Sequence, residues 1–246
     1  MIVVERFTKR YDERVAVDAL EMRVAAGEIV GLAGPNGAGK TTTLRAITGI
    51  LRPSSGRITV DGHDVVTEPV AAKRCLAFVP DDPPLFPSLT VWEHLVLASK
   101  LYGLRDWEAR GAALLEQFDL ADRRDTLADE LSRGMRQKTA ICAALVHEPR
   151  ALLLDEPQMG LDPRGQQDLA DAVHAIAAAG AAVLVSTHQL DDLEDLCTRF
   201  VILRGGRLVA DGTRDELRAR YPELPADASL KEIFFAATEG GARPAA

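Results

Sequence analysis

A glycine-rich segment carries the clearest chemical signal in the chain. Residues 34–41 match G-x-x-x-x-G-K-[ST], a pattern whose backbone N–H groups wrap around phosphate groups. Lys40 can reach the β- and γ-phosphates, and the Thr41 hydroxyl can ligate Mg²⁺. Thr42 can hydrogen-bond a phosphate. The residues of this phosphate loop are Gly34, Pro35, Asn36, Gly37, Ala38, Gly39, Lys40 and Thr41. The loop predicts a nucleoside triphosphate with Mg²⁺, and other motifs must decide between kinases, GTPases and ATPases.

Two carboxylates follow an apolar strand further along the chain. The stretch Ala151–Leu154 is wholly apolar and runs into Asp155 and Glu156. In nucleotidases with a phosphate loop an aspartate at this place holds Mg²⁺, and a neighbouring glutamate can act as a general base. His188 follows the next apolar strand, so it is expected to reach the γ-phosphate and to orient Glu156 or its water. A purely structural role for His188 is the alternative.

A second candidate anion site lies at the start of a helix. Ser132 is a favourable N-cap residue, and its hydroxyl, the Gly134 N–H and the helix N-terminus together suit an anion. Taken alone, the segment is an ordinary helix cap. Its distance in sequence from Lys40 suggests instead a triphosphate shared between two copies of the chain.

The elements that position these residues alternate between strands and helices. Apolar strands are expected at Ile29–Leu32, Cys75–Val79, Ala151–Leu154 and Ala181–Ser186, with helices at Thr41–Thr48 and Gln166–Ala179. Such alternation predicts an α/β fold with a mainly parallel sheet and right-handed crossovers.

Two further parts complete the predicted organisation. Short antiparallel strands are expected in the first 27 residues, at Ile2–Val4, Arg14–Val17 and Leu20–Val24. A helical insertion is predicted at about residues 84–148, within a single domain that spans residues 1–238. The Gly/Ala/Pro-rich tail 239–246 is expected to be disordered.

Composition excludes several classes of protein. The formal net charge of −8 argues against nucleic acid as a direct partner. The longest uncharged stretch, Ala172–Leu190, contains polar residues and suits a helix, turn and strand better than a membrane span. Three widely spaced cysteines, without a CxxC pair, indicate free thiols in a reducing compartment. A cytoplasmic protein follows, and membrane contact would go through a partner.

Together, these motifs resemble the nucleotide-binding subunit of an ABC transporter over about residues 1–238. The characteristic order is the phosphate loop, Leu131–Met135, the acidic pair 155–156, the segment 160–162 and His188. The resemblance implies a P-loop NTPase (RecA-like) core with an N-terminal antiparallel β subdomain and an inserted α-helical subdomain. It also implies ATP hydrolysis with ATP and Mg²⁺ as cofactors.

The resemblance assigns further residues and partners. Tyr11 would stack on the adenine, Ser132 and Gly134 would contact the γ-phosphate bound by the opposite copy, and Asp162 would link the two sites. A head-to-tail homodimer would then drive integral-membrane permease subunits from the cytoplasmic face. The Leu-Ser-x-Gly-Met segment and Ser229–Phe234 most resemble exporters of drugs, antibiotics, polysaccharides or lipids.

Two residues depart from the family pattern. Asp81 stands where a Mg²⁺-ligating glutamine is usual, and a carboxylate there predicts altered metal dependence. Arg133 replaces a glycine and either contacts the opposite ATP or points to solvent.

Two other functions compete with transport. A soluble ABC ATPase acting on DNA or ribosomes would carry a coiled coil or a second cassette, and neither is evident here. A regulatory subunit that closes on ATP without turnover would not need Glu156 and His188, whereas Asp81 is compatible with such a subunit.

Overall fold

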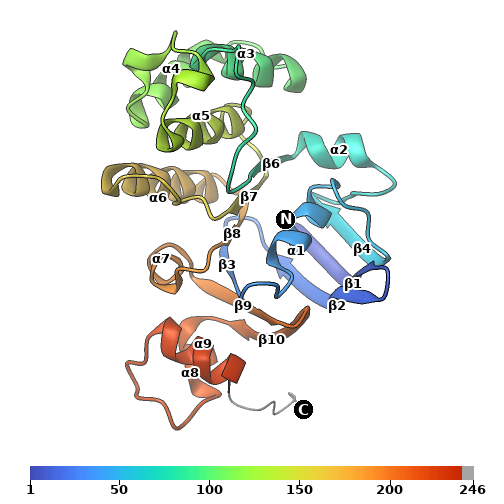
Figure 1. Ribbon diagram of the computed structural model, residues 1–246. Coiled ribbons are helices and arrows are strands. Elements are labelled where there is room, and N and C mark those ends of the chain that lie inside the picture. The colour runs from blue at the N-terminus through green and yellow to red at the C-terminus, as the bar shows by residue number, and fades with distance from the viewer. Residues whose placement is uncertain (240–246) are drawn as a thin grey trace.

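Two β-sheets organise the chain in a computed structural model that describes residues 1–239 (Figure 1). The larger sheet has the strand order β10-β9-β3-β8-β7-β6, and the smaller has the order β2-β1-β4-β5. In the larger sheet β3 pairs parallel with β8 and β9, and β7 pairs parallel with β6 and β8. Only β10 runs antiparallel. The predicted α/β class with a mainly parallel sheet is confirmed.

The central strands are buried on both faces because they consist almost entirely of apolar residues. The six strands of this sheet are β3 (Ile29–Ala33), β6 (Leu76–Val79), β7 (Ala151–Asp155), β8 (Ala182–Ser186), β9 (Arg199–Arg204) and β10 (Arg207–Gly212). Along β7, Leu152 and Leu154 face one core cluster while Leu153 faces the other. Fully buried parallel strands of this kind need helices or a second sheet on each face.

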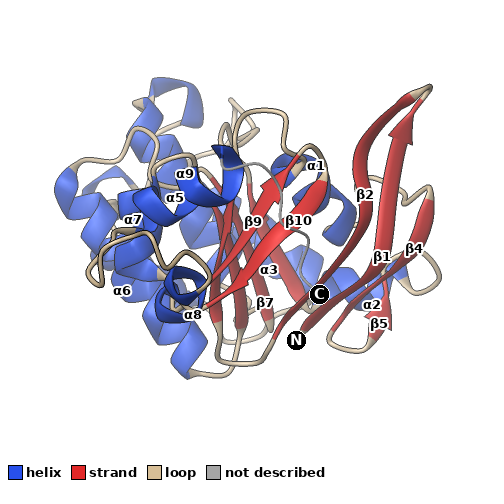
Figure 2. Ribbon diagram, turned by 90° about the horizontal axis from the view of Figure 1, so that it is seen from below, coloured by secondary structure: helices blue, strands red, loops and turns tan. Residues whose placement is uncertain are grey.

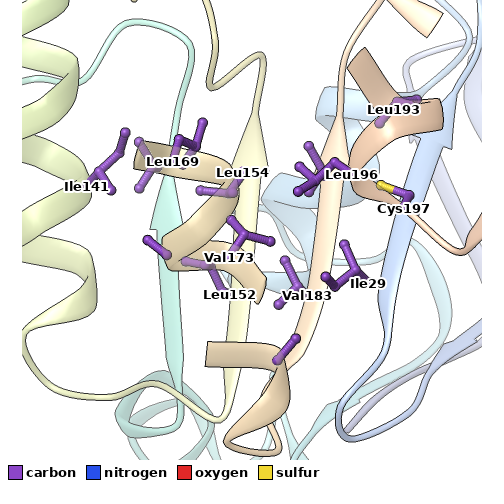
Figure 3. Packing of buried hydrophobic residues seen from close by; sticks show 14 of the residues in the cluster. Ile29, Ile141, Leu152, Leu154, Leu169, Val173, Val183, Leu193, Leu196 and Cys197 are labelled. Carbon is purple, nitrogen blue, oxygen red and sulfur yellow. The ribbon is translucent and has the colours of Figure 1, made fainter. Parts of the chain in front are cut away.

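Helices cover one face of the large sheet (Figure 2). The helices on this face are α5 (Arg133–Leu145), α6 (Pro163–Ala178) and α7 (Leu190–Leu196), while α3 (Val91–Tyr102) and α4 (Glu108–Gln117) pack against α5. Figure 3 shows Leu169 and Val173 of α6 lying against Leu152 and Leu154 of β7, with Ile141 of α5 nearby. The opposite face packs on α1 (Lys40–Ile47) and on the small sheet.

The small sheet differs from its predicted form. Instead of three short strands, the chain forms two long ones, β1 (Ile2–Tyr11) and β2 (Arg14–Val24). The register between them shifts near Arg6 and Ala19, which have φ values of 45° and 46°. Such bulges break the two-residue alternation, which explains why the pattern suggested separate strands. The sheet is completed by β4 (Ser55–Val60) and β5 (His63–Asp64).

Helices α3, α4 and α5 group together at one end of the molecule, at the top in Figure 1. Two short 3-10 turns, 121–123 and 128–130, lie between α4 and α5. Helix α3 begins with a capping box in which Thr90 and Glu93 satisfy each other's backbone N–H groups. Ser132 caps α5 by accepting a hydrogen bond from the Met135 N–H.

The remaining helices lie outside the predicted elements. They are α2 (Pro69–Arg74), α8 (Arg214–Ala219) and α9 (Leu230–Glu239). Apart from Glu239, the last residue of α9, the predicted tail lies outside the described residues. Over residues 1–239, no helix is long and apolar enough to cross a membrane. Cys142 and Cys197 are buried free thiols, and Cys75 is partly buried.

Candidate functional site

The phosphate loop occupies the turn between β3 and α1. Gly37 and Gly39 have φ values of +78° and +105°, a region that L side chains rarely adopt. A Cβ on Gly39 would also lie 2.9 Å from the Ala16 carbonyl oxygen. Helix α1 has no acidic residue in its first turn and no side-chain cap, so its first N–H groups face the loop. The loop therefore offers an anion site at a helix N-terminus.

Lys40 lies inside this loop. Its Nζ donates hydrogen bonds to the carbonyl oxygens of Gly34, at 2.6 Å, and Pro35, at 3.4 Å. Burial lowers the pKa of Lys40, while the carboxylates of Glu156 and Asp155 act in the opposite direction. The ammonium group is thus held beside the carboxylates at the strand ends.

A cavity of about 470 Å³ opens beside the loop. It gathers residues from both sheets and from α1. The lining residues are Tyr11, Arg14, Ala16, Asn36, Gly37, Ala38, Gly39, Lys40, Thr41, Thr42, Asp81, Asp155 and Glu156. Most of the residues predicted to contact nucleotide or metal therefore meet in one place. Gly34 and Pro35 contribute their carbonyls to Lys40 instead of lining this cavity.

Asp155 lies close to several other side chains that carry oxygen atoms. It pairs in register with Ser186 of β8, whose hydroxyl donates a short hydrogen bond to it. The pKa of Asp155 is raised by burial and by the charges of Asp81 and Glu156, against hydrogen bonds from Ser186 and Thr41. Crowded carboxylates beside a hydroxyl match the hard oxygen ligands that Mg²⁺ prefers, and a cation would relieve their repulsion.

The metal would not be held by protein alone. Within residues 1–239, no group of three or more His, Cys, Asp or Glu side chains is arranged to hold a metal ion. Mg²⁺ usually keeps waters and shares its coordination with substrate phosphates. The donor set of Thr41, Asp155 and Asp81 fits that mode of binding.

Glu156 and His188 form a direct pair. His188 Nδ1 lies 2.9 Å from Glu156 Oε2. The Glu156 side chain is 15% exposed, whereas that of His188 is 55% exposed. Glu156 has a φ of 49°, unusual for a residue with a side chain, and its N–H donates to the Ser186 carbonyl. The Glu156 side chain lines the same cavity as Asp155.

Three predicted residues lie in a different place. Ser132, Gly134 and Asp162 line a second cavity of about 380 Å³, together with Lys138 and Arg123. Asp162 caps α6 by accepting a hydrogen bond from the Gly165 N–H, and its pKa is lowered by that bond and by Lys138. One chain therefore presents two separate groups of predicted site residues.

The second group is held together by a close backbone contact. A Cβ on Gly134 would lie 2.4 Å from the Gly160 carbonyl oxygen, so only glycine fits at this position. The aliphatic part of the Arg133 side chain also contacts Gly160, since its Cγ and Cδ lie 3.3 Å from the point where a Cβ on Gly160 would stand. Arg133 itself is exposed. The start of α5 therefore packs against Gly160, in the segment that follows Glu156.

Three residues in or beside the cavity of the phosphate loop were not predicted from the sequence. Arg14 and Ala16 line the cavity, and Ser186 holds Asp155. The two strands are joined by Asp12 and Glu13, without the Asn-Gly or Asp-Gly pair that marks a hairpin in sequence, so the pattern did not place Arg14 opposite Tyr11. The Ser186 contact depends on strand register, which the sequence pattern does not fix.

Comparison with known proteins identifies the family. The model of the ABC transporter family matches residues 17–159, more than half of the chain. The chain belongs to the ABC transporter family. Its ATP-hydrolysing cassettes bind ATP through a phosphate loop of this kind, so the chain is an ATP-binding subunit of that family.

Relatives of this ABC ATPase extend the match over nearly the whole chain. A daunorubicin resistance ATP-binding protein of Streptomyces coeruleorubidus is 40% identical over 94% of this chain and 74% of its own length. A Nod factor export ATP-binding protein of Burkholderia thailandensis is 38% identical over 85% of this chain and 69% of its own. A solved ATP-binding subunit of an ABC transporter is 36% identical, with a TM-score of 0.92 over 96% of this chain and 99% of that one.

Proposed function

We propose that this ABC ATPase hydrolyses Mg²⁺-ATP between two copies of itself and thereby drives separate membrane permease subunits that export a substrate. The observation that carries the proposal is the division of the site residues into two cavities. One holds the phosphate loop, Asp155 and Glu156, and the other holds Ser132, Gly134 and Asp162. A head-to-tail dimer would place the second cavity of one copy over the first cavity of the other.

The residues of the first cavity have distinct proposed roles. Tyr11, 47% exposed, supplies a ring on which adenine stacks. Lys40 and the loop N–H groups would hold the phosphates, while Thr41, Asp155 and Asp81 would hold Mg²⁺. When bound, Mg²⁺ neutralises charge on the β- and γ-phosphates.

Glu156 is the proposed general base. Its carboxylate accepts a proton from the attacking water as the water oxygen bonds to the γ-phosphorus and the bond to the β-phosphate oxygen breaks. His188 keeps that carboxylate oriented through the 2.9 Å contact, and it would face the γ-phosphate of bound ATP. Ser132 and Gly134 of the other copy would donate hydrogen bonds to the γ-phosphate. Asp162 would connect the two sites across the interface.

Export through a permease rests on the relatives. One takes its name from daunorubicin resistance and another from Nod factor export. We therefore propose that this chain acts at the cytoplasmic face of the membrane, bound to a permease, and we expect no direct contact with nucleic acid.

Purification from detergent-solubilised membranes tests the transport part of the proposal. Co-purification of an integral-membrane protein in fixed stoichiometry is the expected result. Recovery only in the soluble fraction, with ribosomes or nucleic acid, would contradict transport and favour a soluble ABC ATPase.

The molecular mass in solution tests whether the chain forms a dimer with ATP. A Glu156→Gln variant should hydrolyse ATP on the order of 10²–10⁴-fold more slowly, since it lacks the general base. Light scattering should then show twice the monomer mass in ATP and the monomer mass in ADP. A monomer under both conditions would contradict the shared site.

A further inference from the structure

Arg14 lies on the wall of the nucleotide cavity, outside the phosphate loop. β1 ends at Tyr11 and β2 begins at Arg14, and the two are direct partners across the hairpin. Opposite residues of an antiparallel pair project from the same face, and so does Ala16, two positions further on. All three line the cavity of about 470 Å³. The hairpin register therefore places a guanidinium beside the ring proposed to stack on adenine.

The guanidinium reaches the phosphate loop. Nη2 of Arg14 lies 3.8 Å from the point where a Cβ on Gly37 would stand. Gly37 is in the middle of the loop, whose N–H groups face the phosphates. The Arg14 side chain thus spans from the small sheet to the part of the cavity where phosphate charge would lie.

The charge of Arg14 is unpaired in the part of the chain that the structure describes. Over residues 1–239, Arg14 makes no side-chain hydrogen bond or ion pair, and it is exposed. On the same hairpin, Lys9 Nζ donates to the Arg52 carbonyl at 3.0 Å, and the side chain of Arg10 also has no partner among residues 1–239 but does not line the cavity. An arginine fork suits phosphate oxygens, because it can offer two parallel N–H groups.

The cavity lining carries more carboxylates than cations. Among the lining residues, three carboxylates (Asp81, Asp155 and Glu156) stand with two cations, Lys40 and Arg14. Nucleotide phosphates add further negative charge. Lys40 belongs to the phosphate loop. Arg14 is the cation that the small sheet contributes to the cavity lining.

We propose that Arg14 is a nucleotide-binding residue whose guanidinium bonds the phosphate chain and so ties the β1–β2 hairpin to the phosphate loop. The proposal rests on nucleotide binding in this cavity and adds a ligand outside the loop. It also makes the position of Tyr11 depend on the phosphates, because both residues belong to one hairpin.

Binding measurements on Arg14→Gln test the proposal. Isothermal titration of ATP and GTP should show that both affinities fall by about 10-fold or more, as expected for a lost charged hydrogen bond. Arg14→Lys should lose less, because it keeps the charge. Arg10→Gln is the matched control: Arg10 is exposed on the same hairpin, pairs with Val15 and does not line the cavity. It removes the same net charge and should leave both affinities within about 2-fold.

Three outcomes would overturn the proposal. One is an Arg14→Gln affinity no different from that of Arg10→Gln. Another is a loss for ATP alone, since this would assign the side chain to the base. The third is an equal loss in Arg14→Lys and Arg14→Gln together with a lowered melting temperature, which would mark a structural role. A Lys40→Met variant with unchanged ATP affinity would instead contradict nucleotide binding by the loop itself.

Discussion

His188 Nδ1 lies 2.9 Å from Glu156 Oε2, although 32 positions separate the two residues in sequence. The contact follows from strand order. β7 and β8 are parallel neighbours that end together at Asp155 and Ser186, so the residues after each strand meet at one edge of the sheet. The left-handed backbone of Glu156 then turns its carboxylate toward the histidine.

Replacing His188 with alanine should slow hydrolysis without weakening ATP binding. The variant loses the group that orients Glu156, and we expect kcat to fall by about 10–100-fold, the cost of a misplaced reacting group. The Kd for ATP should stay within about 2-fold. Single-turnover hydrolysis and equilibrium binding measure the two quantities. An unchanged kcat would show that the pair has no part in the chemistry.

Asp81→Gln should change the metal dependence of hydrolysis. Asp81 shares the cavity with Asp155 and contributes to its raised pKa. Because an amide is a weaker ligand than a carboxylate, the Mg²⁺ concentration for half-maximal activity should rise by about 3–10-fold. The ratio of rates in Mn²⁺ and Mg²⁺ should also change. Asp82→Asn is the control, since Asp82 is exposed and outside the cavity lining. Identical metal profiles for wild type and Asp81→Gln would refute a role in metal binding.

Gly134→Ala should disturb the second cavity. The new methyl group would stand 2.4 Å from the Gly160 carbonyl oxygen, so the start of α5 or the segment at Gly160 must move. Overpacking of this kind costs about 1–3 kcal/mol of unfolding free energy, and hydrolysis should fall by about 10-fold or more. Denaturant unfolding and ATPase assays measure both effects. Arg136→Ala, on the same helix, should change stability by less than about 0.5 kcal/mol. Equal behaviour of the two variants would contradict the close contact.

His147 should make stability fall in mild acid. Its ring stacks on Tyr102 with centroids 3.6 Å apart, and burial, aided by the charge of Arg110, lowers its pKa from 6.5 to about 4. Between pH 6.5 and about pH 4, the unfolded chain carries a proton on His147 that the folded chain lacks. The free energy of unfolding therefore decreases as the pH falls through this range.

A His147→Phe variant isolates this effect, because phenylalanine keeps the stacked ring and cannot titrate. From pH 7 to pH 4.5, wild type should lose about 1–2 kcal/mol more unfolding free energy than the variant. Chemical denaturation at each pH provides the comparison. Parallel pH profiles would show that His147 does not titrate in this range.

Sequence reasoning succeeded where local pattern and chemistry coincide. The strand predicted at Ile29–Leu32 and the helix at Thr41–Thr48 correspond to β3 and α1, with the phosphate loop between them. Asp155 ends β7 and Glu156 follows it as expected, because an all-apolar run fixes both the strand and its end. The roles assigned to these residues remain predictions.

The pattern failed where tertiary pairing decides. β1 and β2 each continue through a bulge, at Arg6 and at Ala19, where the sequence pattern suggested that a strand ends. These bulges form only when β1 pairs with β2 and β4. The edge hairpin β9–β10 and the hydrogen bond from Ser186 to Asp155 likewise depend on strand order. Arg14 enters the cavity because of the hairpin register, which no single-strand pattern reveals.

The central claim is that each ATP is hydrolysed by Glu156 of one copy together with Ser132 of the other, and mixing two inactive variants tests it most directly. Glu156→Gln and Ser132→Arg should each hydrolyse ATP poorly. In a mixed dimer one site combines an intact Glu156 with an intact Ser132. An equal mixture should therefore recover about a quarter of wild-type activity, because half of the dimers are mixed and each has one whole site. If light scattering shows dimers and the mixture is no more active than the average of the two separate variants, the shared site is contradicted.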